Sequence, residues 1–248
     1  MHRSAPRLTR LLACAAVPVM LVVAGCSSDS DSAKNSSTDS SSSASSQNGQ
    51  KPAKVEPAKY AKLPDPCKSI ATKTITNLVP ETKAKTGTAG RSSDTTSRGS
   101  CSWNGLDDNG VKGSQYRWLD ISFLRYESDA SLGVSGEKRA EDNYAKEIAK
   151  AQATEGAKKV RTSPAGGVGD GATAIGYELK KTGEDFTYAT IVTRTDNIVI
   201  TLTYNGTGYA GADSPSSADL MKGAVAAAKE AVASVGVANK PILRPPPT

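Results

Sequence analysis

The chain has 248 residues and a formal net charge of +6, from 31 basic and 25 acidic residues. Arg3, Arg7 and Arg10 lie in an N-terminal segment with the pattern of a signal peptide, so its removal leaves 28 basic against 25 acidic residues. The mature chain has no cluster of Lys and Arg, which argues against nucleic acid as a partner.

The single histidine, His2, lies in the same N-terminal segment. A mature chain without histidine excludes Ser-His-Asp and Cys-His nucleophilic systems and histidine-ligated zinc. Catalysis would have to rely on carboxylates, Lys, Tyr or a Ser-Lys pair. We therefore expect a protein that is not an enzyme and that holds no metal and no cofactor.

The N-terminal segment has the features of a bacterial lipoprotein signal peptide. Its arginines precede an apolar run, residues 11–24, that is too short to span a bilayer as a helix. The run ends in VVAGC at residues 22–26, which resembles the lipobox, where the cysteine receives a diacylglycerol and becomes the new N-terminus. We expect residues 1–25 to be the signal peptide. Cys26 would then anchor the protein to the outer, extracytoplasmic face of the cell membrane.

Composition divides the mature chain into three parts. Serine dominates residues 27–50, and prolines interrupt the unpatterned residues that follow. Such a segment buries too little apolar surface to offset its ordering entropy. We expect residues 26–62 to be a lipidated, disordered tether, residues 63–237 one globular domain, and residues 238–248 a proline-rich tail.

The domain opens with a helix signal. Asp65 is a good N-cap and Pro66 suits the first helical position, so we expect one helix that ends before Pro80. Residues at helical spacing would form its buried face: Cys67, Ile70, Ala71, Thr74 and Leu78. A Gly-, Ser- and Thr-rich loop then leads to a short strand around residues 101–103.

Residues 115–126 alternate strictly, which predicts a strand. One face carries Leu119, Ile121 and Phe123, and we expect this face to lie in the core. The opposite face carries Trp118, Asp120 and Ser122. That face could line a groove or pack beneath a helix, and Trp118 and Asp120 are our candidate ligand-binding residues.

The remaining elements complete an α+β pattern. Helical spacing predicts a helix over 136–154 that buries Ala140, Tyr144, Ile148 and Ala151. Strands are expected at 173–179, 186–194 and 198–204, with a tight turn at residues 196–197. A final helix over 216–235 would bury Leu220, Ala224, Ala227, Ala231 and Val235. The order predicts a mostly antiparallel sheet covered by about three helices.

The cysteines have separate roles. Cys14 leaves with the signal peptide, and Cys26 is the expected lipid site. Cys67 and Cys101 remain as an even pair in an oxidising compartment, which predicts one disulfide. A two-thiolate metal site is the alternative, but the pair lacks the short C-x-x-C spacing and any histidine to complete a tetrahedron.

Several motifs resemble catalytic or nucleotide-binding signatures. Residues 167–172 fit G-x-G-x-x-A, but a dinucleotide site needs a following helix, and here a strand follows. Residues 135–138 fit S-x-x-K and residues 181–183 fit K-T-G, but the S-x-N element of penicillin-binding enzymes is missing between them. Interleaved charges on the helix over 136–154 indicate a solvated surface. We expect the glycine loop to be a tight turn and neither enzyme motif to be catalytic.

Three elements together resemble an actinobacterial cell-envelope lipoprotein family of unknown function. They are D-P-C at residues 65–67, C-x-W at residues 101–103 and G-D-x-A at residues 169–172. The resemblance covers most of residues 63–237. It implies a lipid-anchored extracytoplasmic domain with a disulfide between its two cysteines, and it implies no established activity.

Two functional hypotheses follow. We expect a binding or accessory/sensor module at the outer face of the membrane, with an envelope protein or a small-molecule or glycan ligand as its partner. The alternative is a small hydrolase that cleaves envelope glycan with carboxylates. A pocket with two isolated carboxylates ~5–10 Å apart would favour the hydrolase.

Overall fold

The computed structural model describes residues 54–241. The predicted signal peptide, Cys26, the tether before residue 54 and the tail from residue 242 lie outside the described residues. Among the helices of the described range, none is both long and apolar enough to cross a membrane.

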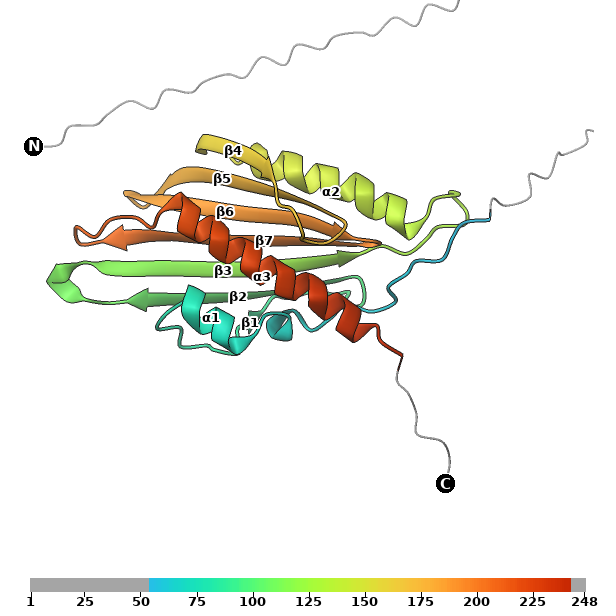
Figure 1. Cartoon of the computed structure of the whole chain (residues 1–248), viewed down its shortest axis with the longest axis horizontal. Helices are drawn as coiled ribbons and strands as arrows, with labels where there is room; N and C mark the ends of the chain where they lie inside the picture. Colours follow the sequence, from blue (N-terminus) through green and yellow to red (C-terminus); the bar gives the residue numbers. More distant parts are fainter. Residues whose placement is uncertain (1–53, 242–248) are drawn as a thin grey trace, which may run out of the picture. The chain divides into compact units, whose positions relative to one another are not determined.

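An antiparallel sheet forms the centre of the domain (Figure 1). Its strands are β1 (Thr88–Ala89), β2 (Arg98–Asp107), β3 (Ser114–Arg125), β4 (Lys158–Pro164), β5 (Gly171–Lys181), β6 (Glu184–Thr195) and β7 (Ile198–Tyr209). They form one seven-stranded sheet in the order β1-β2-β3-β7-β6-β5-β4, and all neighbouring pairs are antiparallel.

Three α-helices accompany this sheet in the described part of the chain. They are α1 (Thr72–Leu78), α2 (Gly136–Gln152) and α3 (Ser217–Ala238), and the short 3-10 helices are η1 (Pro66–Lys68) and η2 (Gly110–Lys112). Helices and an antiparallel sheet together confirm the predicted α+β fold.

The first face of the sheet packs against α3, which crosses the strands in Figure 1. The predicted strand alternation is confirmed, because Leu119, Ile121 and Phe123 are fully buried in the core on this face. The predicted inner stripe of α3 is buried in the same core: Leu220, Ala224, Ala227, Ala231 and Val235.

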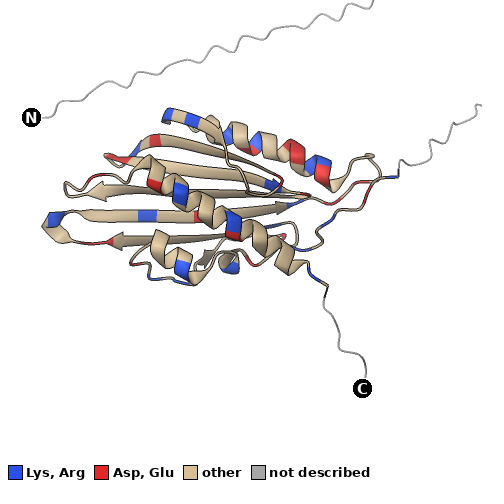
Figure 2. Ribbon diagram, in the orientation of Figure 1, with Lys and Arg blue, Asp and Glu red and all other residues tan. Residues whose placement is uncertain are grey.

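The second face packs against α2 over β5, β6 and β7. Ala140 of α2 is fully buried there, and Tyr144, Ile148 and Ala151 pack around it, as the spacing predicted. Charged residues of both signs alternate along α2, as Figure 2 shows. Lys138 forms ion pairs with Glu141 and Asp142 on the same helix. Over β2 and β3 the same face of the sheet is accessible to solvent: Leu106 is 45% exposed and Trp118 is 36% exposed.

The prediction of one continuous helix from Asp65 to Leu78 is wrong. Asp65 caps η1 as expected, but the Ser69 hydroxyl donates to a carbonyl of η1 at 2.7 Å, where that helix ends. Serine competes in this way with backbone helix bonds. A separate helix, α1, begins at Thr72. The backbone N–H of the preceding residue, Ala71, donates to the Glu230 carboxylate of α3 at 2.7 Å.

The sequence does not predict the edge strands β1 and β4. Every residue of β4 is exposed, so this strand has no apolar alternation from which it could be recognised. Its lysines and arginine are typical of an edge strand, where charge discourages pairing with another chain.

Residues before Leu63, which the sequence assigns to the tether, lie against the domain. The backbone N–H groups of Ala61 and Lys62 both donate to Oδ1 of Asn239 at 3.0 Å. Tyr60 packs against the core on the α3 side of the sheet. The folded part of the chain therefore begins before Leu63.

Candidate functional site

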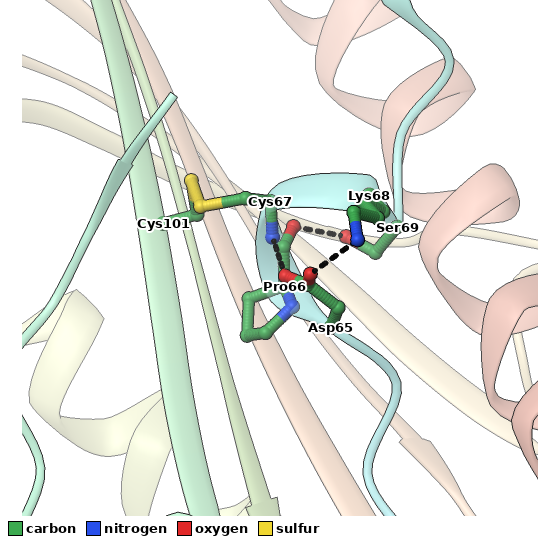
Figure 3. Close-up of a disulfide and its surroundings, with 6 residues drawn as sticks. All are labelled: Asp65, Pro66, Cys67, Lys68, Ser69 and Cys101. Carbon is green, nitrogen blue, oxygen red and sulfur yellow. Dashed lines mark hydrogen bonds and ion pairs between the residues drawn. A yellow bond between two sulfur atoms is a disulfide. The ribbon is translucent and has the colours of Figure 1, made fainter. Parts of the chain in front are cut away.

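The predicted disulfide between Cys67 and Cys101 is confirmed and joins η1 to β2 (Figure 3). The two Cα atoms lie 5.1 Å apart. Trp103, two residues further along β2, is fully buried in the same core. At Gly87 a Cβ would lie 2.4 Å from the Cys101 sulfur and 2.7 Å from the Trp103 ring, so the chain passes both side chains closely. The disulfide and Trp103 therefore stabilise the core on this side of the sheet.

The two motifs of penicillin-binding enzymes have structural roles. Ser135 Oγ accepts a hydrogen bond from the N–H of Lys138 at 3.1 Å, so the S-x-x-K match is the N-cap of α2. The K-T-G match forms the β5–β6 turn, where Thr182 and Gly183 have φ values of 49° and 92°. Successive positive φ values are typical of a two-residue hairpin turn.

The glycine-rich loop is the tight turn that leads into β5. Gly169 has a φ of 61°, and a Cβ there would lie 2.4 Å from the carbonyl oxygen of Arg194. A hollow of about 560 Å³ lies beside the loop, and Asp170 is its only lining carboxylate among the described residues. That carboxylate accepts a hydrogen bond from the N–H of Asp196 at 2.6 Å and is therefore already engaged.

A cleft of about 590 Å³ opens on the second face of the sheet, beside the region that α2 covers. Its lining comes from β3, β6, β7, the end of β5 and the β5–β6 turn. The lining residues are Tyr116, Trp118, Asp120, Lys181, Thr182, Phe186, Tyr188, Thr203, Asn205 and Tyr209. The cleft thus combines aromatic walls with a few polar groups.

Strand register places the walls of this cleft. Trp118 on β3 lies opposite Asn205 on β7, and Asn205 lies opposite Tyr188 on β6. Side chains two strands apart are separated by about 10 Å in a sheet. Trp118 and Tyr188 therefore flank a slot, with the buried side chain of Asn205 between them.

Aromatic contacts fix the wall at one end. The Tyr116 ring meets Phe186 and Tyr209 edge-on, with ring centroids 6.1 and 6.5 Å apart. Tyr188 stacks on Tyr177 of β5, with centroids 4.7 Å apart and planes 7° apart. Because Tyr177 on β5 covers one face of the Tyr188 ring, the other face is directed towards β7 and the cleft. These contacts give the aromatic walls a defined shape.

Asp120 is the only carboxylate among the described residues of the cleft lining. Burial raises the pKa of Asp120 to about 6, and hydrogen bonding with its cross-strand neighbour Thr203 offsets this only in part. Within residues 54–241, Asp120 forms no ion pair with Lys or Arg. In the same range no group of three or more His, Cys, Asp or Glu side chains is placed to hold a metal ion.

The structure thus brings the two predicted ligand-binding residues, Trp118 and Asp120, into one cleft. Binding itself stays a prediction. The other residues of the cleft walls are not predicted from the sequence. Tyr116 could have been found, because it continues the alternation of Trp118 and Asp120 on β3. Tyr188 and Asn205 join the cleft only through the pairing of β6 and β7 with β3, which a single sequence does not specify.

The fold and the cleft define an antiparallel α+β domain with an open, aromatic-lined site. The chain belongs to the family described as "Protein of unknown function (DUF3558)", which matches residues 21–173. Membership confirms that the family is one of unknown function, does not test the motifs on which the resemblance was based, and adds no activity. A comparison with curated proteins gives no match.

One solved structure, "Crystal structure of LpqN involved in cell envelope biogenesis of Mycobacterium tuberculosis", shows a limited similarity to this chain. The match has 17% sequence identity and a TM-score of 0.27, and it covers 50% of this chain and 65% of LpqN. It therefore spans less than two thirds of LpqN. A similarity of this size supports no argument about the chain.

Proposed function

We propose that the chain is a lipid-anchored binding or accessory module of the bacterial cell envelope, with the cleft around Trp118 and Asp120 as its ligand site. Cys26 would hold the protein at the outer face of the cell membrane. Support for the anchor comes from the arginine-rich segment, the short apolar run and the VVAGC sequence at residues 22–26. The disulfide fits an oxidising compartment outside the cytoplasm.

One observation carries the proposed site: the carboxylate of Asp120 lies among aromatic side chains inside a cleft and has no ion-pair partner within residues 54–241. Burial raises the pKa of Asp120 to about 6, so at neutral pH the fold holds an ionised group in a place that disfavours its charge. Ionisable side chains whose pKa is strongly shifted by burial are concentrated at functional sites. Apolar walls with a few placed polar groups are also typical of small-ligand pockets.

The alternative of a glycan hydrolase has less support from the same cleft. Hydrolysis by the usual carboxylate mechanism requires two carboxyl groups on either side of the scissile bond. Among the described residues that line the cleft, Asp120 is the only Asp or Glu. A binding role needs no second carboxylate.

The test is a thermal-shift screen with the mature chain, residues 26–248, in which Cys26→Ser removes the lipid site. Cell-wall glycans, lipid headgroups and envelope peptides are added to the wild-type domain sequence, to Trp118→Ala and to Leu106→Ala. Leu106 is the matched control, because it is exposed on the same sheet face and lies outside the cleft lining.

We expect at least one compound to stabilise the wild-type sequence and Leu106→Ala, and to lose its effect on Trp118→Ala. Equal stabilisation of all three proteins would place the binding site elsewhere. Turnover is measured in parallel. Multiple-turnover hydrolysis that Asp120→Asn abolishes without loss of folding would replace the binding role with catalysis.

A further inference from the structure

The cleft contains one negative and one positive side chain that are not paired with each other. Asp120 comes from β3, and Lys181 comes from the end of β5. Neither forms an ion pair within the described residues. A partly buried carboxylate without an ion-pair partner would be stabilised by a positively charged group on a bound ligand.

Lys181 shows that the cleft accommodates an ammonium group. Its Nζ atom lies 5.4 Å from the centroid of the Tyr188 ring. This is within the roughly 6 Å range of a cation–π interaction. Lys181 is exposed and borders the turn at Thr182 and Gly183, so its flexible side chain can leave the ring.

Asp120 lies next to the aromatic slot. Trp118 and Asp120 are two residues apart on β3, so their side chains project from the same face about 7 Å apart along the strand. Tyr188 lies across the slot from Trp118, two strands away. A ligand cation between the two rings would therefore lie beside the carboxylate of Asp120.

We propose that the cleft recognises its ligand through an ammonium group, which lies between Trp118 and Tyr188 beside Asp120 and displaces Lys181. This inference rests on the proposed function, because it assumes that the cleft is the ligand site. Amino sugars and amine-bearing lipid headgroups share the chemistry, and the experiment below separates these two sources.

The protonation of Asp120 supports the inference. Its pKa of about 6 means that the carboxylate is mostly ionised at neutral pH and loses its charge in mild acid. The other titratable groups that face the cleft are Lys181 and the phenols of Tyr116, Tyr188 and Tyr209. Burial raises the pKa of Tyr116 above its ordinary value. Ammonium binding should therefore weaken as the pH falls through about 6.

The experiment compares charged probes with neutral analogues of the same shape. The mature chain with Cys26→Ser is titrated at neutral pH by calorimetry with choline and with 3,3-dimethyl-1-butanol, in which carbon replaces the nitrogen. Glucosamine and glucose form the second pair. We expect saturable binding of at least one amine and about tenfold or weaker binding of its neutral analogue.

Two variants locate the ammonium. Asp120→Asn should weaken amine binding about tenfold or more, because the carboxylate charge is lost. Lys181→Met should strengthen it several-fold, because the competing ammonium is removed from Tyr188. Lys180→Met is the matched control, since Lys180 is exposed on the same strand and lies outside the cleft lining. Melting curves establish that each variant is folded.

The possible outcomes separate this inference from the proposed function. If neither amine binds, or the neutral analogues bind as tightly, ammonium recognition is overturned. Unchanged amine binding by Asp120→Asn overturns it as well. In each of these cases the cleft remains the ligand site if Trp118→Ala abolishes the response to some other compound. If every ligand tolerates Trp118→Ala, the proposed function fails.

Discussion

The side-chain amide of Asn197 forms two hydrogen bonds with the backbone of Tyr60. The N–H of Tyr60 donates to Oδ1, and Nδ2 donates to the carbonyl oxygen of Tyr60, both at 2.9 Å. Nδ2 also donates to the carbonyl oxygen of Tyr126 at 2.9 Å. The fully buried Asn197 at the β6–β7 turn therefore ties the entering chain to the end of β3.

Asn197→Ala should lower the free energy of unfolding by about 2–4 kcal/mol. The change removes three partly buried hydrogen bonds and leaves backbone groups of Tyr60 and Tyr126 without these partners. Urea denaturation measures the loss, and limited proteolysis should cut residues 54–62 faster in the variant. The exposed Asn109→Ala is the control and should change stability by less than about 0.5 kcal/mol. Equal stability of the two variants would contradict the role given to Asn197.

Asp120→Asn should stabilise the domain at neutral pH. The pKa of about 6 in the folded protein exceeds the ordinary aspartate value of 3.8, so the native state binds more protons than the unfolded state between these pH values. The free energy of unfolding of the wild-type protein therefore falls as the pH rises through this window. Above it, ionised Asp120 lowers that free energy by its full amount, about 2–3 kcal/mol. The asparagine variant should be more stable above about pH 6 and equal to wild type below about pH 4.

The pH effect of Asp120 is measured as a difference in unfolding free energy between variant and wild type, by urea denaturation across this range. This difference cancels contributions from other acids, such as Asp129, whose hydrogen bonds lower its pKa. Val111→Ala, at an exposed residue without a titratable side chain, is the control and should give a difference that does not change with pH. A difference for Asp120→Asn that is equally flat would contradict the burial of its charge.

Loss of the disulfide should destabilise the domain by about 3–4 kcal/mol. Cys67 and Cys101 are 34 residues apart, and cross-linking a loop of that length restricts the unfolded chain by this amount in the chain-entropy model. The double variant Cys67→Ser, Cys101→Ser and the reduced wild-type protein should unfold at similar denaturant concentrations. Labelling of both thiols in the native, unreduced protein would refute the cross-link.

Cys26→Ala should abolish anchoring of the protein by lipid. Two or more acyl chains hold a protein at a bilayer far more firmly than one, and each buried CH₂ contributes about 0.8 kcal/mol. The variant should accumulate as unprocessed precursor, or appear in the medium if another peptidase cuts it. Mass spectrometry of the wild-type N-terminus should detect the lipid. Normal processing and membrane retention of the variant would argue against the anchor.

Local patterns were sufficient to predict the elements whose burial follows a simple period. The alternation in β3 placed Leu119 in the core and Trp118 on the opposite face, because a strand that is buried on one side leaves that mark on its sequence. Interactions between distant residues left no such mark. The break before α1 depends on Glu230, which accepts a hydrogen bond from Ala71 across 159 residues of chain. Tyr188 likewise reaches the cleft only through strand pairing.

The two tryptophans permit the most direct test of the cleft as a ligand site. The chain has two Trp residues, of which Trp103 is fully buried beside the disulfide and Trp118 is 36% exposed at the cleft. The measurement is the ¹H–¹⁵N spectrum of their indole groups as a soluble glycan and lipid-headgroup fraction of the bacterial envelope is added. We predict that the Trp118 signal shifts to saturation while the Trp103 signal stays in place. A ligand that stabilises the protein and leaves the Trp118 signal unmoved would contradict the account.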